Sequence, residues 1–117
     1  MTEPALNLSI APLTTYRIGG TAREAYFPET AEELSGILDT LRKSGTKWFV
    51  LGGGSNVLVG DGFWDGAVIV TTKLDRWRAE NDRIVCGAGL PSSKVAEIAR
   101  DHAKTGLEFL YLLPGTI

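Results

Sequence analysis

Five consecutive residues, Gly52-Gly53-Gly54-Ser55-Asn56, have the types and spacing of a loop that binds an anion. They come directly after an apolar run that ends at Leu51. Glycine accepts positive φ and has no Cβ, so successive backbone N–H groups can point together at a ligand. Ser55 and Asn56 add side-chain donors. A phosphate or pyrophosphate is the natural ligand of such a loop, although an ordinary glycine-rich turn has the same composition.

Two well-known phosphate-binding motifs do not fit this loop. A P-loop requires a lysine followed by a hydroxyl residue, and no such pair follows Gly54. A Rossmann fingerprint requires a third glycine that opens a helix, with an acidic residue about 20 positions further on. Val57 stands in place of that glycine. Asp75 has a suitable spacing, but the stretch 57–66 contains too many glycines to be the helix. The loop therefore predicts a phosphate site that leads from a strand into extended chain.

The single histidine and the single cysteine have no neighbours that indicate catalysis or metal binding. His102 falls on the apolar side of a predicted helix near its C-terminus, which favours packing or a dipole interaction over a catalytic base. Cys86 alternates with Val85 in a strand pattern, which favours a small buried hydrophobe over a reactive thiol. One cysteine supplies neither an intramolecular disulfide nor a zinc or iron–sulfur ligand set, so we expect no metal site.

Four side chains near predicted turns have both a structural and a functional interpretation. Phe63 and Trp64 follow an Asp-Gly turn, and we expect a loop aromatic that packs over the core rather than a ring that stacks on a ligand. Glu108 is expected to brace a turn. Arg17 is the basic side chain that we single out for contact with a ligand.

The elements expected before the glycine loop form a β–α–β unit. The stretch 24–27 predicts a first strand. Thr30 and Glu33 have the spacing of a capping box, and the apolar stripe behind them predicts a helix that ends at Gly45. The apolar run 48–51 predicts a strand buried on both faces. We expect the two strands to be parallel, with the helix as their crossover.

After the glycine loop in the sequence, the hydrophobic pattern predicts two more strands and a second helix. Strands are expected at 67–71 and 83–86, with a hairpin turn in the polar stretch 80–82. The helix is expected over 93–104, with Gly106 beyond its end. The predicted fold class is α/β (α+β in stricter usage), a mixed sheet with packed helices.

The domain organisation follows from the ends of the chain. Residues 1–15 lack clear periodicity and are expected to form an N-terminal arm. Residues 16–117 are expected to form one domain, and its last five residues resemble a loop more than a domain end.

The overall composition is that of a globular protein. The chain has 117 residues, of which 44% are hydrophobic and 22% charged, and its formal net charge is −2. This balance offers no basic footprint for nucleic acid or an anionic membrane surface. No stretch reaches the about 20 apolar residues of a membrane helix, and the N-terminus does not resemble a secretory signal. We expect a cytoplasmic protein.

Five segments, in this order, resemble the UDP-N-acetylenolpyruvoylglucosamine reductases. They span nearly the whole chain and consist of Tyr16-Arg17-Ile18-Gly19-Gly20, the stretch 50–59, Gly87-Ala88-Gly89, Gly106-Leu107-Glu108-Phe109 and Pro114-Gly115-Thr116. The glycine loop alone resembles the wider class of vanillyl-alcohol-oxidase-type FAD-binding domains. The other segments make the narrower family the better match.

The resemblance implies an FAD cradle made mostly of backbone. It implies a pyrophosphate held by Gly52, Gly53, Gly54, Ser55 and Asn56. It also implies that Gly115 and Thr116 run beside the flavin, with Gly89 near the same cofactor. The glycines at 19 and 20 are expected to shape an entrance turn. Backbone amides can hold two phosphates without a basic side chain, which suits a chain with no excess of positive charge.

The chemistry of this family is a two-stage hydride transfer. NADPH reduces FAD, and the flavin hydride goes to the enolpyruvyl carbon of a UDP-sugar, giving UDP-N-acetylmuramate for peptidoglycan. The serine, arginine and glutamate that catalyse the reduction match no position in this chain, so no residue is named catalytic. We therefore expect the N-terminal FAD-binding part of such an enzyme, truncated before the substrate-binding domain and without turnover by itself.

The chain also departs from the family pattern, and other functions stay open. Thr14 stands where the family often has asparagine, and Tyr111-Leu112 stands where small residues are common and would crowd the flavin edge. One alternative is a non-catalytic flavin- or nucleotide-binding module that acts through a partner chain. A second is a structural fragment that holds no cofactor. A third is another oxidase of the same FAD fold.

Overall fold

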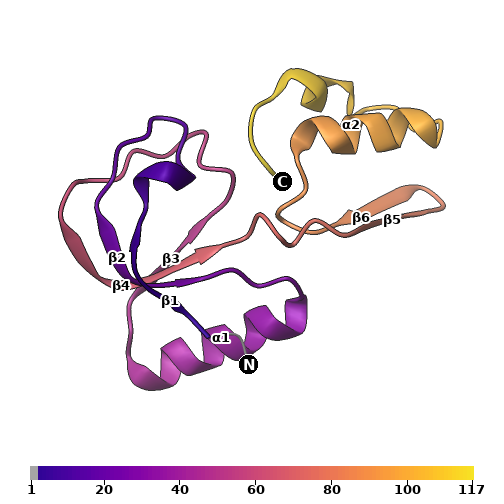
Figure 1. Cartoon of the computed structure of the whole chain (residues 1–117). Helices are drawn as coiled ribbons and strands as arrows, with labels where there is room; N and C mark the ends of the chain where they lie inside the picture. Colours follow the sequence, from indigo (N-terminus) through magenta and orange to yellow (C-terminus); the bar gives the residue numbers. More distant parts are fainter. Residues whose placement is uncertain (1–2) are drawn as a thin grey trace.

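A computed structural model describes residues 3–117 and shows two lobes (Figure 1). The N-terminal lobe contains a four-stranded mixed sheet with the strand order β1-β2-β4-β3. Strand β1 is antiparallel to β2, whereas β2 and β3 both run parallel to β4. The elements of this lobe are β1 (Ala5–Ser9), the 3-10 helix η1 (Ala11–Leu13), β2 (Thr21–Tyr26), α1 (Ala31–Ser44), β3 (Trp48–Leu51) and β4 (Phe63–Val70). The fold class and the parallel β–α–β unit are therefore as the sequence predicted.

The strand β4, rather than β3, occupies the buried centre of the sheet. Residues 67–70 are all buried, whereas Trp48 and Val50 of β3 are exposed. The prediction that 48–51 is buried on both faces was therefore wrong. The physical reason is the strand order: β3 lies at the sheet edge, and α1 packs over β2 and β4 without covering it. An apolar run of four residues does not distinguish a central strand from a partly covered edge.

Helix α1 begins and ends where the sequence predicted. The Thr30 hydroxyl accepts a hydrogen bond from the Glu33 amide at 3.1 Å. The Glu33 carboxylate accepts from the Glu29 amide at 2.9 Å, one residue before the amide that a capping box would use. Gly45 closes the helix with φ 69°, in the left-handed region that glycine adopts without strain.

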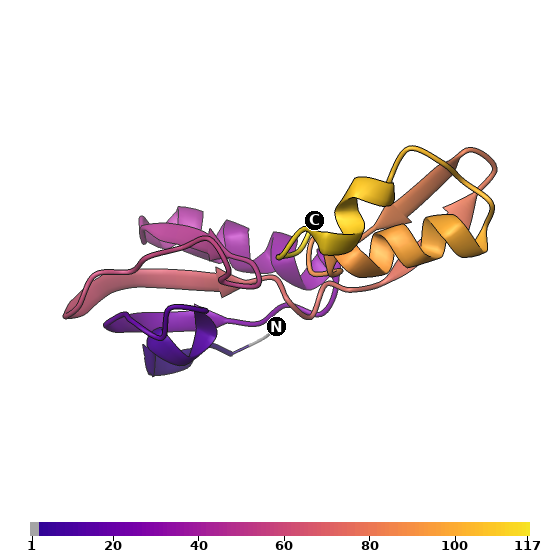
Figure 2. The ribbon, with the colours of Figure 1, turned by 90° about the horizontal axis from the view of Figure 1, so that it is seen from above.

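Side-chain clusters cover both faces of the four-stranded sheet, and Figure 2 shows this lobe from above. On one face Ile37 and Leu41 of α1 pack against Ala67 and Ile69. On the other face a second cluster joins Ile10 to buried residues of β2, β3 and β4. The sequence did not predict β1, which lies within the stretch 1–15 expected as an arm. Leu6 and Leu8 alternate with Asn7 and Ser9, but the strand is only five residues long, and Asn7, with φ 52°, interrupts its extended backbone.

The C-terminal lobe is a hairpin covered by one helix. It contains β5 (Trp77–Glu80), β6 (Arg83–Cys86), α2 (Ser92–Asp101) and the 3-10 helix η2 (Glu108–Leu112). The turn predicted at 80–82 is present. It joins β6 to β5, a strand that the sequence did not predict, and not to the strand expected at 67–71. Helix α2 ends three residues earlier than expected. The core of this lobe consists of Leu90 and the α2 residues Val95 and Ile98, which pack against Ile84 and Cys86.

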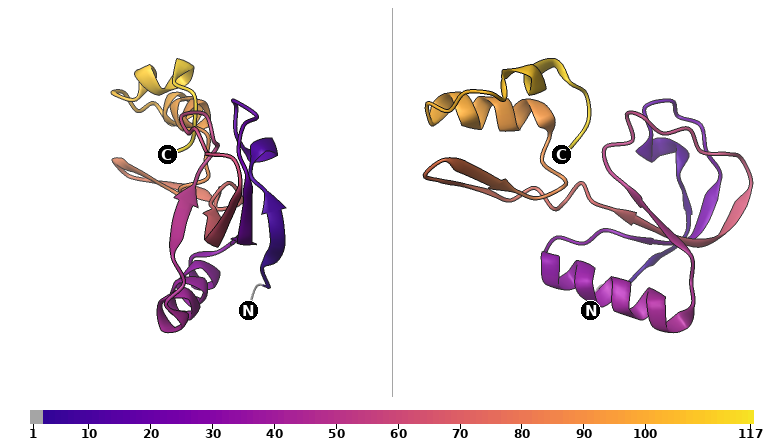
Figure 3. Two further views of the ribbon diagram at one scale, coloured as in Figure 1. Left: turned by 90° about the vertical axis from the view of Figure 1, so that its left-hand side faces the viewer. Right: turned by 180° about the vertical axis from the view of Figure 1, so that it is seen from behind.

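The two lobes lie end to end and give the chain an elongated shape. The molecule measures 46 × 30 × 16 Å, and its radius of gyration is 15.9 Å. A compact domain of this length would have a radius of gyration of about 13 Å. Figure 3 shows the C-terminus in the space between the lobes. No helix within residues 3–117 is long and apolar enough to cross a membrane.

Candidate cofactor site

The glycine loop 52–56 follows β3 at the carboxyl end of the parallel strands and packs against the segment 13–15. The amide of Thr15 donates a hydrogen bond to the Gly54 carbonyl at 2.9 Å. A Cβ atom on Gly54 would overlap the Leu13 carbonyl oxygen and lie 2.9 Å from the Cα of Thr14. Glycine is therefore required at position 54 by close packing as well as by its φ of 73°.

The opposite wall of the loop comes from the other end of the chain. A Cβ atom on Gly52 would lie 2.9 Å from the Thr116 hydroxyl oxygen, and one on Gly115 would lie 3.1 Å from the Ser55 hydroxyl oxygen. The Gly115 carbonyl accepts a hydrogen bond from the Ser92 amide at 3.0 Å, which ties this wall to the start of α2. The structure thus brings together seven of the eight residues predicted to bind a cofactor.

The backbone of the loop differs from the prediction in one respect. Only Gly54 of the three glycines has positive φ. At Gly52 the absence of a side chain allows Thr116 to approach closely. At Gly53 a Cβ would make only an ordinary contact, 3.6 Å from the Thr116 methyl group. The loop is therefore less contorted than three adjacent glycines suggest. Close packing between segments explains more of its glycine content than backbone conformation does.

The amides of the loop are donors without acceptors. Within residues 3–117, no backbone N–H from Gly52 to Asn56 donates a hydrogen bond to another protein group. The side chains of Ser55, Asn56 and Thr116 likewise have no hydrogen-bond partner in that part of the chain. Buried backbone N–H groups in folded proteins are nearly always paired, and Gly54 in this loop is buried. Five consecutive unpaired donors and three polar side chains therefore fit an anionic ligand such as a diphosphate.

Gly89 lies at the junction of the two lobes and not in the loop. A Cβ atom on it would overlap the Thr71 carbonyl oxygen and lie 2.8 Å from the carbonyl carbon of Thr72. Its amide donates to the Leu74 carbonyl at 2.9 Å and is not free for a ligand. The Thr71 hydroxyl is 4.0 Å from the position of a Cβ on Gly52. Gly89 thus packs beneath the cradle, and its contact with a cofactor stays a prediction.

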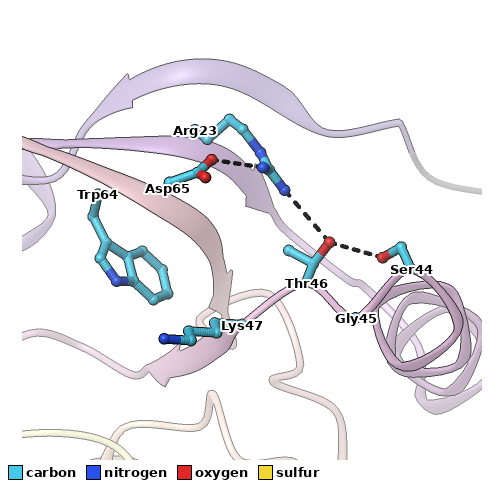
Figure 4. Close-up of a pocket in the computed structure, with 7 residues that line it drawn as sticks. All are labelled: Arg23, Ser44, Gly45, Thr46, Lys47, Trp64 and Asp65. Atoms are coloured by element: carbon cyan, nitrogen blue, oxygen red, sulfur yellow. Dashed lines mark hydrogen bonds and ion pairs between the residues drawn. The ribbon is translucent and has the colours of Figure 1, made fainter.

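A polar cavity of about 440 Å³ lies at a different place, by the C-terminal end of α1 (Figure 4). Its lining includes Arg23, Thr46, Lys47, Trp64 and Asp65. The guanidinium of Arg23 pairs with Asp65 at 2.6 Å and donates to the Thr46 hydroxyl at 3.4 Å. None of the predicted cofactor residues lines this cavity, so the cavity and the glycine loop are separate places in the molecule.

The structure supports the packing interpretations of most single residues. The Trp64 ring contacts the Phe49 ring with centroids 5.1 Å apart, although it lies in β4 and not in a loop. The ring nitrogen Nδ1 of His102 is 2.8 Å from the Ile98 carbonyl, and its imidazole meets Trp77 edge-on at 5.8 Å. The carboxylate of Glu108 accepts a hydrogen bond from the Gly106 amide at 2.9 Å and so braces that turn, as predicted.

Of the three remaining side chains, Phe63 and Arg17 are exposed and Cys86 is half-buried. Phe63 is 61% exposed and does not pack over the core. Cys86 is half-buried against the α2 cluster, which fits a small hydrophobe. Arg17 is exposed and has a positive φ of 57°. The wall 13–15 was missed as part of the site, because its contact with Gly54 depends on η1, and the short sequence Ala-Pro-Leu gives no periodic pattern.

The four-stranded mixed sheet, with a glycine loop of unpaired amides at the end of a parallel strand, defines the class of the protein by its fold. The chain belongs to the family of FAD binding domains, whose model matches residues 23–117.

Relatives over most of the chain are UDP-N-acetylenolpyruvoylglucosamine reductases. The protein from Caldicellulosiruptor saccharolyticus is 42% identical over 104 residues, which cover 89% of this chain and 34% of the relative. The protein from Halalkalibacterium halodurans is 36% identical over 116 residues, covering 98% and 38%. The crystal structure of the Thermus caldophilus enzyme superposes with a TM-score of 0.65 at 30% identity, covering 99% of this chain and 39% of that one. The chain thus spans little more than a third of the length of these relatives.

Proposed function

We propose that this chain is the FAD-binding part of a reductase that uses NADPH to convert UDP-N-acetylglucosamine enolpyruvate to UDP-N-acetylmuramate. The observation that supports this most strongly is the set of unpaired donors from Gly52 to Asn56, enclosed between the segments 13–15 and 115–116. Family membership makes FAD the expected occupant. The relatives named above suggest the NADPH and UDP-sugar chemistry.

The residues present fit the diphosphate of FAD. Amides of Gly52, Gly53 and Gly54 would hold phosphate oxygens, with added donors from Ser55 and Asn56. Gly115 and Thr116 would line the flavin side, and the absence of a side chain on Gly115 lets this segment pack closely against Ser55. When bound, FAD would supply hydride transfer. This chain's own part is to bind and orient it, and we propose no catalytic residue within the chain.

The setting of this activity is part of the proposal. A single free cysteine agrees with a reducing compartment, and we propose the cytoplasm, with a role in peptidoglycan synthesis. A non-catalytic flavin module, a fragment without cofactor, and another oxidase of the same fold remain the alternatives.

The test is a titration of the folded chain with FAD, followed by flavin fluorescence and visible absorption, with FMN as the control. Saturable binding of FAD but not FMN is expected, because FMN carries one phosphate and no diphosphate. Equal binding of both flavins would contradict a diphosphate cradle. Oxidation of NADPH in the presence of the enolpyruvyl UDP-sugar is expected to stay at background for the chain alone, which distinguishes cofactor binding from turnover.

A further inference from the structure

Arg17 has a backbone conformation that its residue type disfavours. Its φ is 57°, in the left-handed region where a Cβ is strained. Two other non-glycine residues share this feature. Ala103 follows the end of α2, where a left-handed residue commonly closes a helix, and Asn7 belongs to a residue type that tolerates the region. Neither reason applies to Arg17, and strained residues of this kind gather at functional sites.

The turn that contains Arg17 is attached to the glycine loop. The Arg17 amide donates to the Thr14 carbonyl at 3.3 Å, and the Thr15 amide donates to the Gly54 carbonyl at 2.9 Å. The Cα of Thr14 lies 2.9 Å from the position of a Cβ on Gly54. Arg17 therefore lies two residues after Thr15, whose amide is hydrogen-bonded to the glycine loop. An arginine side chain is long enough to span this separation.

The charge of Arg17 is not neutralised by the protein. Within the described residues 3–117, its guanidinium has no ion pair, hydrogen bond or ring contact. Other arginines of the chain pair with carboxylates, such as Arg23 with Asp65 at 2.6 Å and Arg42 with Asp39 at 3.3 Å. The glycine loop itself contains no basic residue. An unpaired guanidinium, on a turn that is hydrogen-bonded to a loop of unpaired amides, is suited to a bidentate contact with phosphate oxygens.

We propose that Arg17 binds the diphosphate of the nucleotide held by the Gly52–Asn56 loop. This inference rests on the proposed function and names the charged partner of the anion in that site. The amides would position the two phosphates, and the guanidinium would add a charged hydrogen bond at the open side. The strained turn would keep the side chain directed at the cradle and away from carboxylates.

The experiment is a titration with FAD and, separately, with ADP, which has the diphosphate but no flavin. Arg17→Gly removes the side chain and relieves the backbone, while Arg17→Gln keeps the backbone strain and removes the charge. Arg83→Gln is the matched control, because Arg83 is exposed at the hairpin turn of the other lobe. We expect both Arg17 variants to bind FAD and ADP about tenfold more weakly, as for a lost charged hydrogen bond, with a flatter salt dependence. Arg83→Gln is expected to bind like the original chain.

Thermal unfolding separates binding from folding. Arg17→Gly is expected to unfold at the same or a higher temperature than the original chain, since glycine accepts positive φ. If Arg17→Gly binds FAD and ADP as tightly as the original chain, the role of Arg17 is overturned while the amide cradle stands. If the folded original chain binds neither ligand, the proposed function fails, and the role of Arg17 with it.

Discussion

The two lobes of the molecule differ in how completely their apolar side chains are buried. In the N-terminal lobe a four-stranded sheet is covered on both faces, and Ala67, Val68 and Ile69 are fully buried. In the C-terminal lobe a two-stranded hairpin is covered by α2 alone. Leu112 is 87% exposed and Phe109 68% exposed on η2. The N-terminal lobe therefore has the burial of a stable unit, whereas the C-terminal lobe has much less apolar area removed from water.

The candidate site combines both lobes. The glycine loop and the wall 13–15 belong to the well-packed lobe, while Gly115 and Thr116 belong to the other. A diphosphate held by the loop would therefore lie against one rigid wall and one more adaptable wall. The well-packed sheet therefore sets the geometry of the loop, whereas the wall that is proposed to line the flavin depends on the less completely packed lobe.

The largest effect is expected from adding one methyl group to the rigid wall. Gly54→Ala combines a clash with Leu13 and a disfavoured φ, and should destabilise the chain by about 3 kcal/mol or more and abolish FAD binding. Gly45→Ala is the matched control, because φ there is 69° but nothing lies within 4 Å of the added atom. It should cost only about 1 kcal/mol. Urea unfolding measures both, and equal losses would refute the close-packing account.

Core truncation tests the difference between the lobes directly. Ile69→Ala in the covered sheet should cost about 4 kcal/mol, at the upper end for a buried isoleucine. Ile98→Ala, equally buried in α2, should cost about 2 kcal/mol because the smaller lobe can collapse around the cavity. Hydrogen exchange should accordingly be slower in β4 than in β5 and β6. Equal exchange protection in the two lobes would contradict the proposed difference in their stability.

The cap of α1 is expected to matter by a smaller amount. Thr30→Ala removes the hydroxyl that accepts from the Glu33 amide and should cost about 1 kcal/mol. Thr105→Ala, at an exposed position outside the helices, serves as the control. Faster exchange confined to the first turn of α1 would sharpen the view that this lobe opens locally from its ends. A loss of stability as large as that of Ile69→Ala would be inconsistent with it.

The smallest effect concerns alkaline pH. Burial, followed by the hydrogen bond from the Tyr26 hydroxyl to Glu24 at 3.1 Å, raises the pKa of Tyr26 above its ordinary value of 10.0. Because the unfolded chain then loses this proton first, the stabilisation is complete below pH 10 and is lost as the pH rises toward the folded pKa. Unfolding measured at pH values below and above 10 should therefore show a decline that Tyr26→Phe reduces. An unchanged decline in Tyr26→Phe would assign it to other groups.

Local chemistry made part of this fold predictable from the sequence. The capping pair Thr30 and Glu33, the terminal Gly45 and the turn at 80–82 are encoded by neighbouring residues, and all appear in the structure. Strand order is set by distant segments, so the edge position of 48–51 and the pairing of β5 with β6 were not predicted. β1 was missed for a related reason, because its pairing with β2 and not its own pattern holds it in place.

The candidate site shows the same division. The loop 52–56 was identified from its own residues, and its neighbour Thr116 from the family resemblance. The wall 13–15 was not identified, since only the folded chain brings Leu13 against Gly54. The sequence attributed the three glycines to positive φ and to the missing Cβ, and at Gly52 the structure shows only the second reason, the close approach of Thr116. Packing thus explains why glycine stands at positions 52 and 54, while the role of these residues in binding stays a prediction.

The most direct test of the central claim observes the loop amides themselves during binding. In proton–nitrogen correlation spectra of the labelled chain, FAD and ADP should shift the amide signals of Gly52, Gly53, Gly54, Ser55 and Asn56, while riboflavin, which has no phosphate, should not. We expect these signals to move together with one saturation curve. Saturable FAD binding that leaves these amides unshifted, or that shifts mainly the residues around the Arg23 cavity, would contradict a diphosphate site at the glycine loop.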